Sequence, residues 1–325
     1  MTVVWVIWAA VVLDLLIGDP RWLPHPVIGM GKAIRRVEGW IRHWATSAQS
    51  LKRAGILLPV IVAGGSFVLA WLLLELCAAI HPWLAWGVEI VLIATTIAIK
   101  GLRGAGLEVY GHLRSGHIAE ARRALSMVVG RDTGHLDEPE IVRGTVETVA
   151  ENIVDAVIAP LFFALIGGAP LAMAYRAVNT LDSMVGYKNE KYQHIGWASA
   201  RLDDMANWIP ARLTAGLLTM VAAMFSLQWK KAIKMVRRDA RKHPSPNSGF
   251  PESAVAGALG IRLGGENSYQ GIISFRAYMG DADRPLEAED IRVTNRLLLG
   301  VSVLFTLLGT VVLGLVAASG GRLWI

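Results

Sequence analysis

Long apolar stretches constrain this chain more than any other feature of its sequence. The clearest runs from residue 54 to 80, and the others cover residues 2–18, 83–99, 156–175, 206–227 and 297–318. A helix needs about 20 predominantly apolar residues to cross the hydrocarbon core of a bilayer. We therefore predict an all-α fold, a polytopic membrane bundle with about four to six membrane segments, in one integral-membrane domain spanning residues 1–325.

Charge and composition predict how the bundle is oriented. Hydrophobic residues make up 54% of the chain, and the net charge is +6. Basic residues are concentrated in 20–53, 100–152 and 228–296. Because Lys and Arg favour cytoplasmic loops, we expect these portions on the cytoplasmic side and the turn at His81 on the other. The placement of residues 179–205 stays open, because the run 156–175 is interrupted at 167–170 and either kinks or forms two half-helices.

Three carboxylates at a spacing of four residues form the most unusual polar pattern. Glu147, Glu151 and Asp155 lie in RGTVETVAENIVDAVIAP, directly before an apolar run, and Asn152 lies on a neighbouring stripe. Residues four apart share one face of a helix. Such a face persists when it is solvated, paired with cations or bound to a metal. Ionisable groups at a membrane segment are costly and indicate a functional site by default.

A second polar cluster follows the apolar run 156–175. Its members are Arg176, Asn179, Asp182, Ser183, Tyr187, Lys188, Arg201, Asp203 and Asp204. Carboxylate and amide oxygens suit Mg²⁺, and guanidinium groups suit phosphate, so this mixture is typical of a magnesium–phosphate site. A solvated loop with salt bridges is the alternative interpretation.

Three further stretches carry candidate site residues. In HPSPNSGFPESAVAGALG, Ser245 and Asn247 precede a helix of small residues that Glu252 opens. The start of such a helix suits an anion, although close packing alone also explains the small residues. The loop GDPRWLPHPVIGMGK, with Asp19 and His25, forms either a turn at the membrane interface or one wall of a ligand site. In GRDT, Arg131 and Asp132 either contact a phosphate or close a turn.

Five motifs, taken together and in order, resemble the CbiB/CobD family of cobalamin biosynthesis, the adenosylcobinamide-phosphate synthases. They are LDLLIGDPRWLPHPVIGMG, RGTVETVAENIVDAVIAPLFFALIGGAP, AVNTLDSMVGYKNEKY, SARLDDMANWIPARLTA and HPSPNSGFPESAVAGALGIRLGG. The resemblance covers nearly the whole chain. Five long motifs in one order are far more specific than a single short pattern.

The resemblance implies a multi-pass enzyme of the bacterial inner membrane with its active site on the cytoplasmic side. Such enzymes join the propionate carboxylate of adenosylcobyric acid to the amine of (R)-1-amino-2-propanol phosphate or ethanolamine phosphate. The product is adenosylcobinamide phosphate, and ATP is consumed. Activating the acid, most simply as an acyl phosphate, calls for Mg²⁺ and cations around the transferring phosphoryl group. A carboxylate then accepts the proton of the attacking ammonium.

On this interpretation we assign roles to the candidate residues. Mg²⁺ is expected at Glu147, Glu151, Asp155 and Asp203, with Glu147, Glu151, Asp155 and Asp204 acting in catalysis. ATP and phosphate are expected at Arg176, Lys188, Arg201, Ser245 and Asn247. Substrate contacts are expected from Asp14, Asp19, His25, Asn152, Asn179, Asp182, Glu252 and Tyr269. Further expected partners are membrane lipid, other membrane enzymes of late cobalamin assembly and a second copy of the chain, but not nucleic acid.

Two other classes of protein are compatible with parts of the pattern. A membrane family of the AmpE type looks similar in part and is associated with sensing, so the acidic face would then detect a ligand. A transporter is favoured only by the interruption at 167–170 and by charges near the membrane, and the chain has no evident internal repeat.

Overall fold

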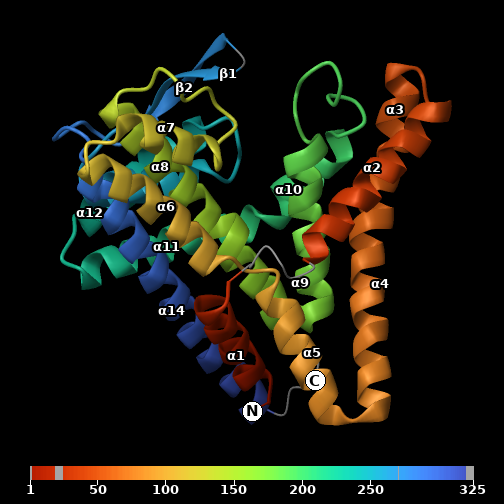
Figure 1. Cartoon of the computed structure of the whole chain (residues 1–325). Coiled ribbons are helices and arrows are strands. Elements are labelled where there is room, and N and C mark those ends of the chain that lie inside the picture. The colour runs from red at the N-terminus through yellow and green to blue at the C-terminus, as the bar shows by residue number, and fades with distance from the viewer. Residues whose placement is uncertain (1, 19–24, 270, 320–325) are drawn as a thin grey trace. The chain divides into compact units, whose positions relative to one another are not determined.

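The fold is a set of helices joined by short loops, with one small hairpin of strands (Figure 1). The structure is a computed structural model, and it describes residues 2–18, 25–269 and 271–319. Within these residues, four helical stretches are long and apolar enough to cross a membrane: Ala48–Ile80, Pro82–Arg114, Glu138–Val185 and Ala288–Ala318. Two shorter apolar helices, Val4–Leu16 and Trp208–Met224, accompany them. The predicted class, a polytopic helical membrane protein, is confirmed.

The chain forms two compact units that alternate along the sequence. Unit 1 comprises Met1–Ala98, Ala159–Asn207 and Thr306–Ile325. Unit 2 comprises Ile99–Ile158 and Trp208–Phe305. Each unit is therefore assembled from segments that are distant in sequence.

Unit 1 contains most of the apolar helices. Its helices are α1 (Thr2–Leu16), α2 (Pro26–Trp44), α3 (Ala48–Ala54), α4 (Leu57–Ile80), α5 (Pro82–Ala94), α9 (Ala159–Val185) and α10 (Trp197–Ala206). Helices α2, α4 and α9 lie side by side (Figure 1) and enclose a core that includes Ile34, Leu58 and Leu181. The outward face of α4 exposes large apolar side chains such as Leu69 and Leu76, which suits contact with lipid.

Sequence explains where α4 ends and α5 begins. The Nδ1 atom of His81 accepts a hydrogen bond from the backbone N–H of Trp83, at 3.2 Å, and Pro82 occupies the first helical position of α5. Proline is favoured there because its missing N–H would have no partner inside the helix. The predicted tight connection between the runs 54–80 and 83–99 is thus a helical hairpin turn.

Helix α9 is interrupted where the sequence predicts a break. Gly167 and Gly168 leave the helical conformation, and Gly168 has φ 62° and ψ −161°, a combination that essentially only glycine adopts. The backbone N–H of Ala169 restarts the helix and donates to Oε1 of Glu89 on α5 at 3.3 Å. Pro170 then lies in the first turn of the second half, where it removes no helical hydrogen bond.

Unit 2 is built around α13 (Gly249–Leu259), a helix in which every residue except Phe250 is buried. Its elements are α6 (Ile99–Arg114), α7 (Ile118–Ser126), α8 (Glu138–Ile153), the π-helical turn η1 (Val154–Ile158), α11 (Trp208–Met224), α12 (Trp229–Asp239), the 3₁₀ turn η2 (Ala240–Lys242), α13 (Gly249–Leu259), β1 (Leu263–Tyr269), β2 (Ile272–Met279) and the first part of α14 (Ala288–Ala318). Helix α13 packs against α12 at Gly257, where an added Cβ would lie 2.6 Å from the Cα of Ala232. Close packing therefore accounts for the small residues of α13.

An antiparallel hairpin of β1 and β2 completes unit 2 and was not predicted. Asn267 pairs with Ser274 and Gly265 with Arg276, with a bulge between Leu263 and Gly265. Gly264 and Gly265 have φ of 83° and 99°, which allows the backbone to bend there. The strand LGGENSY has few apolar residues, so its sequence lacks the alternation that usually indicates a strand.

Candidate functional site

The predicted acidic face begins on α8 of unit 2. Asp137 caps this helix by accepting from the backbone N–H of Glu140 at 3.0 Å, and a proline follows at the start. Glu147 and Glu151 lie one turn apart, the first buried and the second half-buried. Asp155 lies in the π-helical turn η1, where the hydrogen bonds join residues i and i+5 in place of i and i+4, so the angular spacing of the α-helix changes before Asp155.

Glu147 is paired with cations. Arg131 donates to its Oε2, while Arg143 donates to its Oε1 at 3.3 Å and the backbone N–H of Gly264 donates to the same oxygen at 2.8 Å. Of the three explanations for the acidic face, pairing with cations thus applies to Glu147. The carboxylate is 1% exposed, so the two guanidinium groups supply the compensation that a buried charge requires.

The same two arginines attach the hairpin to α8. Arg143 donates to the carbonyl oxygens of Gly264 and Glu266, both at 2.7 Å, and Arg131 donates to Oδ1 of Asn267 at 2.6 Å. Asp132 accepts from the backbone N–H of Gly271 at 2.8 Å and from the hydroxyl of Ser268 at 2.5 Å. Asp132 therefore contacts the distant β1–β2 hairpin.

The loop before α13 brings a third motif to this face. The hydroxyl of Ser248 donates to Oε1 of Glu151 at 2.8 Å. Ser245 fixes the loop, because its hydroxyl oxygen accepts from the backbone N–H groups of Asn247 and Ser248 at 3.2 Å. Two predicted site stretches, far apart in sequence, thus meet within unit 2.

Glu252, in the first turn of α13, is the most unusual group in unit 2. It is fully buried, and in the described part of the chain neither carboxylate oxygen has a hydrogen-bond partner. Nε2 of His243 lies 3.7 Å from Oε1 of Glu252. Burial, followed by the nearby carboxylates of Glu147 and Glu151, raises the pKa of Glu252 well above its usual range, and Arg276 and Arg131 oppose this.

His243 and Arg276 are neighbours of Glu252 that set the charge around it. Burial and then Arg276 lower the pKa of His243, so its imidazole is neutral. Arg276 on β2 donates to the hydroxyl of Tyr269 at 2.9 Å, which fixes one end of the guanidinium. The result is a carboxyl group beside a neutral imidazole, an arrangement that can accept, hold and release a proton.

A cavity of about 470 Å³ adjoins this network in unit 2. Arg131, Arg143 and Asn267 line it on the side of Glu147, and the Arg262 guanidinium lies 4.2 Å from the ring centre of Tyr278, which also lines it. Cavities of this size hold small molecules in other proteins. A ligand here would contact the charged network directly.

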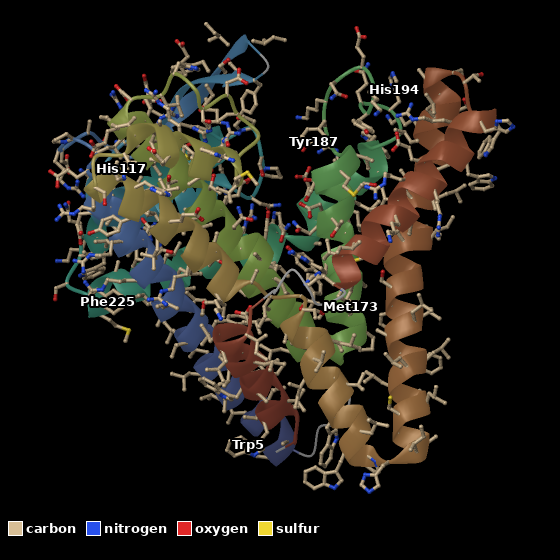
Figure 2. All side chains as sticks on the ribbon, in the orientation of Figure 1. Trp5, His117, Met173, Tyr187, His194 and Phe225 are labelled. Carbon is tan, nitrogen blue, oxygen red and sulfur yellow. The ribbon has the colours of Figure 1, made fainter. Side chains whose placement is uncertain are left out.

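The second predicted cluster lies in unit 1. Asn207 donates to Oδ2 of Asp203 at 3.1 Å, and Arg201 contacts Asp204 at 3.4 Å. Burial, followed by the carboxylate of Asp182, raises the pKa of Asp203 to about 7. Lys188 and Arg201 are exposed, and the loop after α9 carries Tyr187, which is exposed, and His194, which is partly buried (Figure 2). Arg176 and Asn179 line a separate cavity.

The structure distributes the predicted site residues between the two units. Unit 2 contains Glu147, Glu151, Asn152, Asp155, Ser245, Asn247, Glu252 and Tyr269, and unit 1 contains Asp14, His25, Arg176, Asn179, Asp182, Lys188, Arg201, Asp203 and Asp204. Asp19 lies outside the described residues. Within the described residues, no group of three or more His, Cys, Asp or Glu side chains is arranged to hold a metal ion. A Mg²⁺ site shared by Glu147 and Asp203 stays a prediction.

One predicted substrate residue, His25, has a local structural role, and another, Asp14, is buried. Nδ1 of His25 accepts from the backbone N–H of Val27 at 3.3 Å and so caps α2. Asp14 is 2% exposed on α1. Sequence reasoning missed Arg143, His243, Asn267 and Arg276. Only Arg143 carried a signal, because it precedes Glu147 by four residues, the spacing of a helical ion pair.

The helices and buried charges define an integral membrane protein of the helical type with ionisable groups gathered in two clusters. The family model described as CobD/Cbib protein matches residues 7–298, so the chain belongs to the CobD/CbiB family. A "Cobalamin biosynthesis protein CobD" from Geobacter metallireducens is 50% identical over 306 residues, covering 94% of this chain and 95% of the relative. A "Cobalamin biosynthesis protein CbiB" from Salmonella arizonae is 48% identical over 293 residues, covering 90% and 92%. No solved structure matches the chain.

Proposed function

We propose that this protein is an ATP-dependent amide ligase of cobalamin biosynthesis, working on the cytoplasmic side of the bacterial inner membrane. It would join the propionate carboxylate of adenosylcobyric acid to the amine of (R)-1-amino-2-propanol phosphate or ethanolamine phosphate, giving adenosylcobinamide phosphate. Family membership and the names of the relatives support the pathway. The buried Glu252, beside His243 and Glu151, is the observation that supports the reaction type.

The reaction needs a base for the attacking amine. The propionate oxygen attacks the γ-phosphorus of ATP, so that ADP leaves and an acyl phosphate forms. The amine nitrogen then attacks the acyl carbon, the C–N bond forms and inorganic phosphate leaves. The proton lost by nitrogen would pass to Glu252 in its ionised form, and the raised pKa that burial gives this carboxyl means that it binds the proton more tightly than an ordinary glutamate. Glu151 of α8 is close enough for the charge on its carboxylate to raise the pKa of Glu252 further.

Mg²⁺ that enters with ATP would need only a few ligands from the protein. Mg²⁺ that accompanies a nucleotide is commonly held by one or two carboxylates together with phosphate oxygens. Glu151 and Asp155 fit that need, whereas Glu147 is already neutralised by Arg131 and Arg143. Bound Mg²⁺ would neutralise charge on the transferring phosphoryl group. Arg176, Lys188 and Arg201 in unit 1, and Ser245 and Asn247 in unit 2, stay our candidates for contacts with phosphate.

The direct experiment supplies detergent-purified protein with adenosylcobyric acid, Mg-ATP and each aminoalcohol phosphate in turn. Mass spectrometry follows the corrinoid amide, and ADP is measured in parallel. We expect an amide whose appearance requires ATP, and the amine that supports it identifies the natural substrate. Well-folded protein that neither binds the corrinoid nor forms the amide would contradict the proposal.

A further inference from the structure

Unit 1 contains a cavity of about 420 Å³ between α2 and α9. Val27, Ile28, Gly31 and Arg35 of α2 line one wall, and Arg176, Asn179, Thr180, Ser183 and Met184 of α9 line the other. These two helices pack side by side in unit 1 (Figure 1). The cavity therefore presents one guanidinium from each wall.

The two guanidinium groups face a cavity without acidic lining. No carboxylate belongs to the described residues that line it. Nε of Arg176 is buried and, in the described part of the chain, has no hydrogen-bond partner. A buried donor on a cation that lacks a partner costs free energy, so the site is incomplete without an acceptor.

Arg35 is directed back along α2 toward this cavity. Its Nη1 lies 4.0 Å from the position that a Cβ on Gly31 would occupy, one turn earlier on the helix. Gly31 also leaves space beside the sulfur of Met184, which lies 3.5 Å from that position. A small residue at position 31 thus keeps the cavity open, and the long side chain of Arg35 can reach over it.

The buried arginines of unit 2 differ from Arg176 because they have carboxylate partners. There, Arg131 and Arg143 each donate to the carboxylate of Glu147, so each buried guanidinium has an acidic partner within the protein. On α2, Glu38 is used by Arg42 at 2.8 Å and not by Arg35. In the part of the chain that the structure describes, the cavity thus has two cationic lining residues and no acidic one, and such a lining suits an anionic ligand.

We propose that this cavity binds the dianion of a phosphate monoester, held between Arg35 and Arg176. Guanidinium groups bind phosphate oxygens through paired hydrogen bonds, and the cavity is large enough for a small phosphorylated molecule. Asn179 supplies a further polar group on the same wall. This inference rests on the proposed function in one respect, because Arg176 is already a candidate there for contact with phosphate. The part played by Arg35 and the position of the cavity are new.

The test measures binding and does not depend on turnover. Inorganic phosphate is titrated into the full-length protein in a chloride buffer, and the dissociation constant is obtained by calorimetry. We expect saturable binding that Arg176→Gln and Arg35→Gln each weaken at least about tenfold, because each removes hydrogen bonds from a charged donor. Arg36→Gln is the matched control, since it removes the same charge from the next position of α2, which is exposed as Arg35 is but does not line the cavity.

A second variant addresses the cavity without changing charge. Gly31→Leu places a side chain in the lined space and should also weaken phosphate binding, with an unchanged unfolding temperature showing that the fold is intact. Equal binding by Arg35→Gln, Arg176→Gln and the parent protein would overturn the proposal, as would equal weakening by Arg35→Gln and Arg36→Gln.

The source of the phosphate is separated by changing the membrane. Protein in nanodiscs of neutral lipid is compared with protein in nanodiscs that contain phosphatidic acid, whose headgroup is also a phosphate monoester. Binding of inorganic phosphate in neutral nanodiscs that requires Arg176 supports a soluble ligand. Thermal stabilisation by phosphatidic acid alone that requires Arg176 supports a lipid. The absence of both effects would contradict the site.

Discussion

At the scale of single residues, the charge network around Glu147 organises unit 2. Its carboxylate joins α8 to the segment before it and to the hairpin, through Arg131, Arg143 and Gly264. Removing one member of a buried ion-pair network leaves the other charges without compensation. Such a loss is far more costly than the loss of a pair on the surface.

We predict that Glu147→Gln lowers the free energy of unfolding by about 3–5 kcal/mol, because Arg131 and Arg143 then remain buried without a carboxylate. Thermal or denaturant unfolding in detergent measures the loss. Glu120→Gln, at an exposed position of α7, is the control and should leave stability unchanged. Equal stability of the Glu147→Gln protein and the parent would show that the network is not required.

Asp203 in unit 1 makes stability depend on pH. Its pKa is about 7 in the folded protein because of burial and the neighbouring Asp182. A carboxyl group whose pKa is higher in the folded than in the unfolded state binds more protons when folded, at pH values between the two. The free energy of unfolding should therefore fall as pH rises from about 4 to about 7, by at most about 1.4 kcal/mol per pH unit.

Asp203→Asn should remove this part of the pH dependence, because asparagine does not titrate. Unfolding temperatures measured between pH 5 and 7 in detergent compare the two proteins. If both proteins lose stability with the same slope, Asp203 is already ionised in the folded state.

At the scale of elements, much of the helical pattern could be predicted from sequence. Apolar runs placed α4, α5, α11 and the later part of α14 within a few residues, since each must bury or expose a continuous apolar surface. The hairpin could not be predicted, because backbone contacts with Arg143 and a contact with Arg131 hold it in place. These partners are far from it in sequence and follow no period.

The candidate site, like the fold, was only partly predictable from sequence. The spacing of Glu147 and Glu151 predicted one helical face, and both residues lie on α8. The π-helical turn at Asp155 has no sequence signal that we can identify. Arg276, which influences Glu252 and His243, lies on a strand whose position depends on the tertiary fold.

The interruption of α9 gives a prediction at this scale. Gly168→Ala should lower stability by about 1–3 kcal/mol, because a Cβ is strained at its backbone angles. Gly64→Ala, in the regular part of α4 with no atom within 4 Å of the added Cβ, should be neutral or stabilising by up to about 1 kcal/mol. Unfolding temperatures of the two variants test this, and a neutral Gly168→Ala would mean that the helix can continue without the break.

At the scale of the whole molecule, basic segments predict the orientation in the membrane. Cys77 is the only cysteine, so single cysteines can be introduced into a Cys77→Ser background. His81→Cys, in the turn between α4 and α5, should react with a membrane-impermeant maleimide in intact cells. Lys234→Cys, on the exposed face of α12, should react only after permeabilisation. Labelling of both positions, or of Lys234→Cys alone, in intact cells would contradict this orientation.

The central claim is that the buried carboxyl of Glu252 accepts a proton during ATP-dependent amide formation. The most direct measurement is the rate of corrinoid amide formation by Glu252→Gln, with Glu120→Gln as the control. Glutamine keeps the volume but cannot accept the proton, so we expect a loss of at least about 100-fold at an unchanged unfolding temperature. Full turnover by a well-folded Glu252→Gln protein would contradict the account.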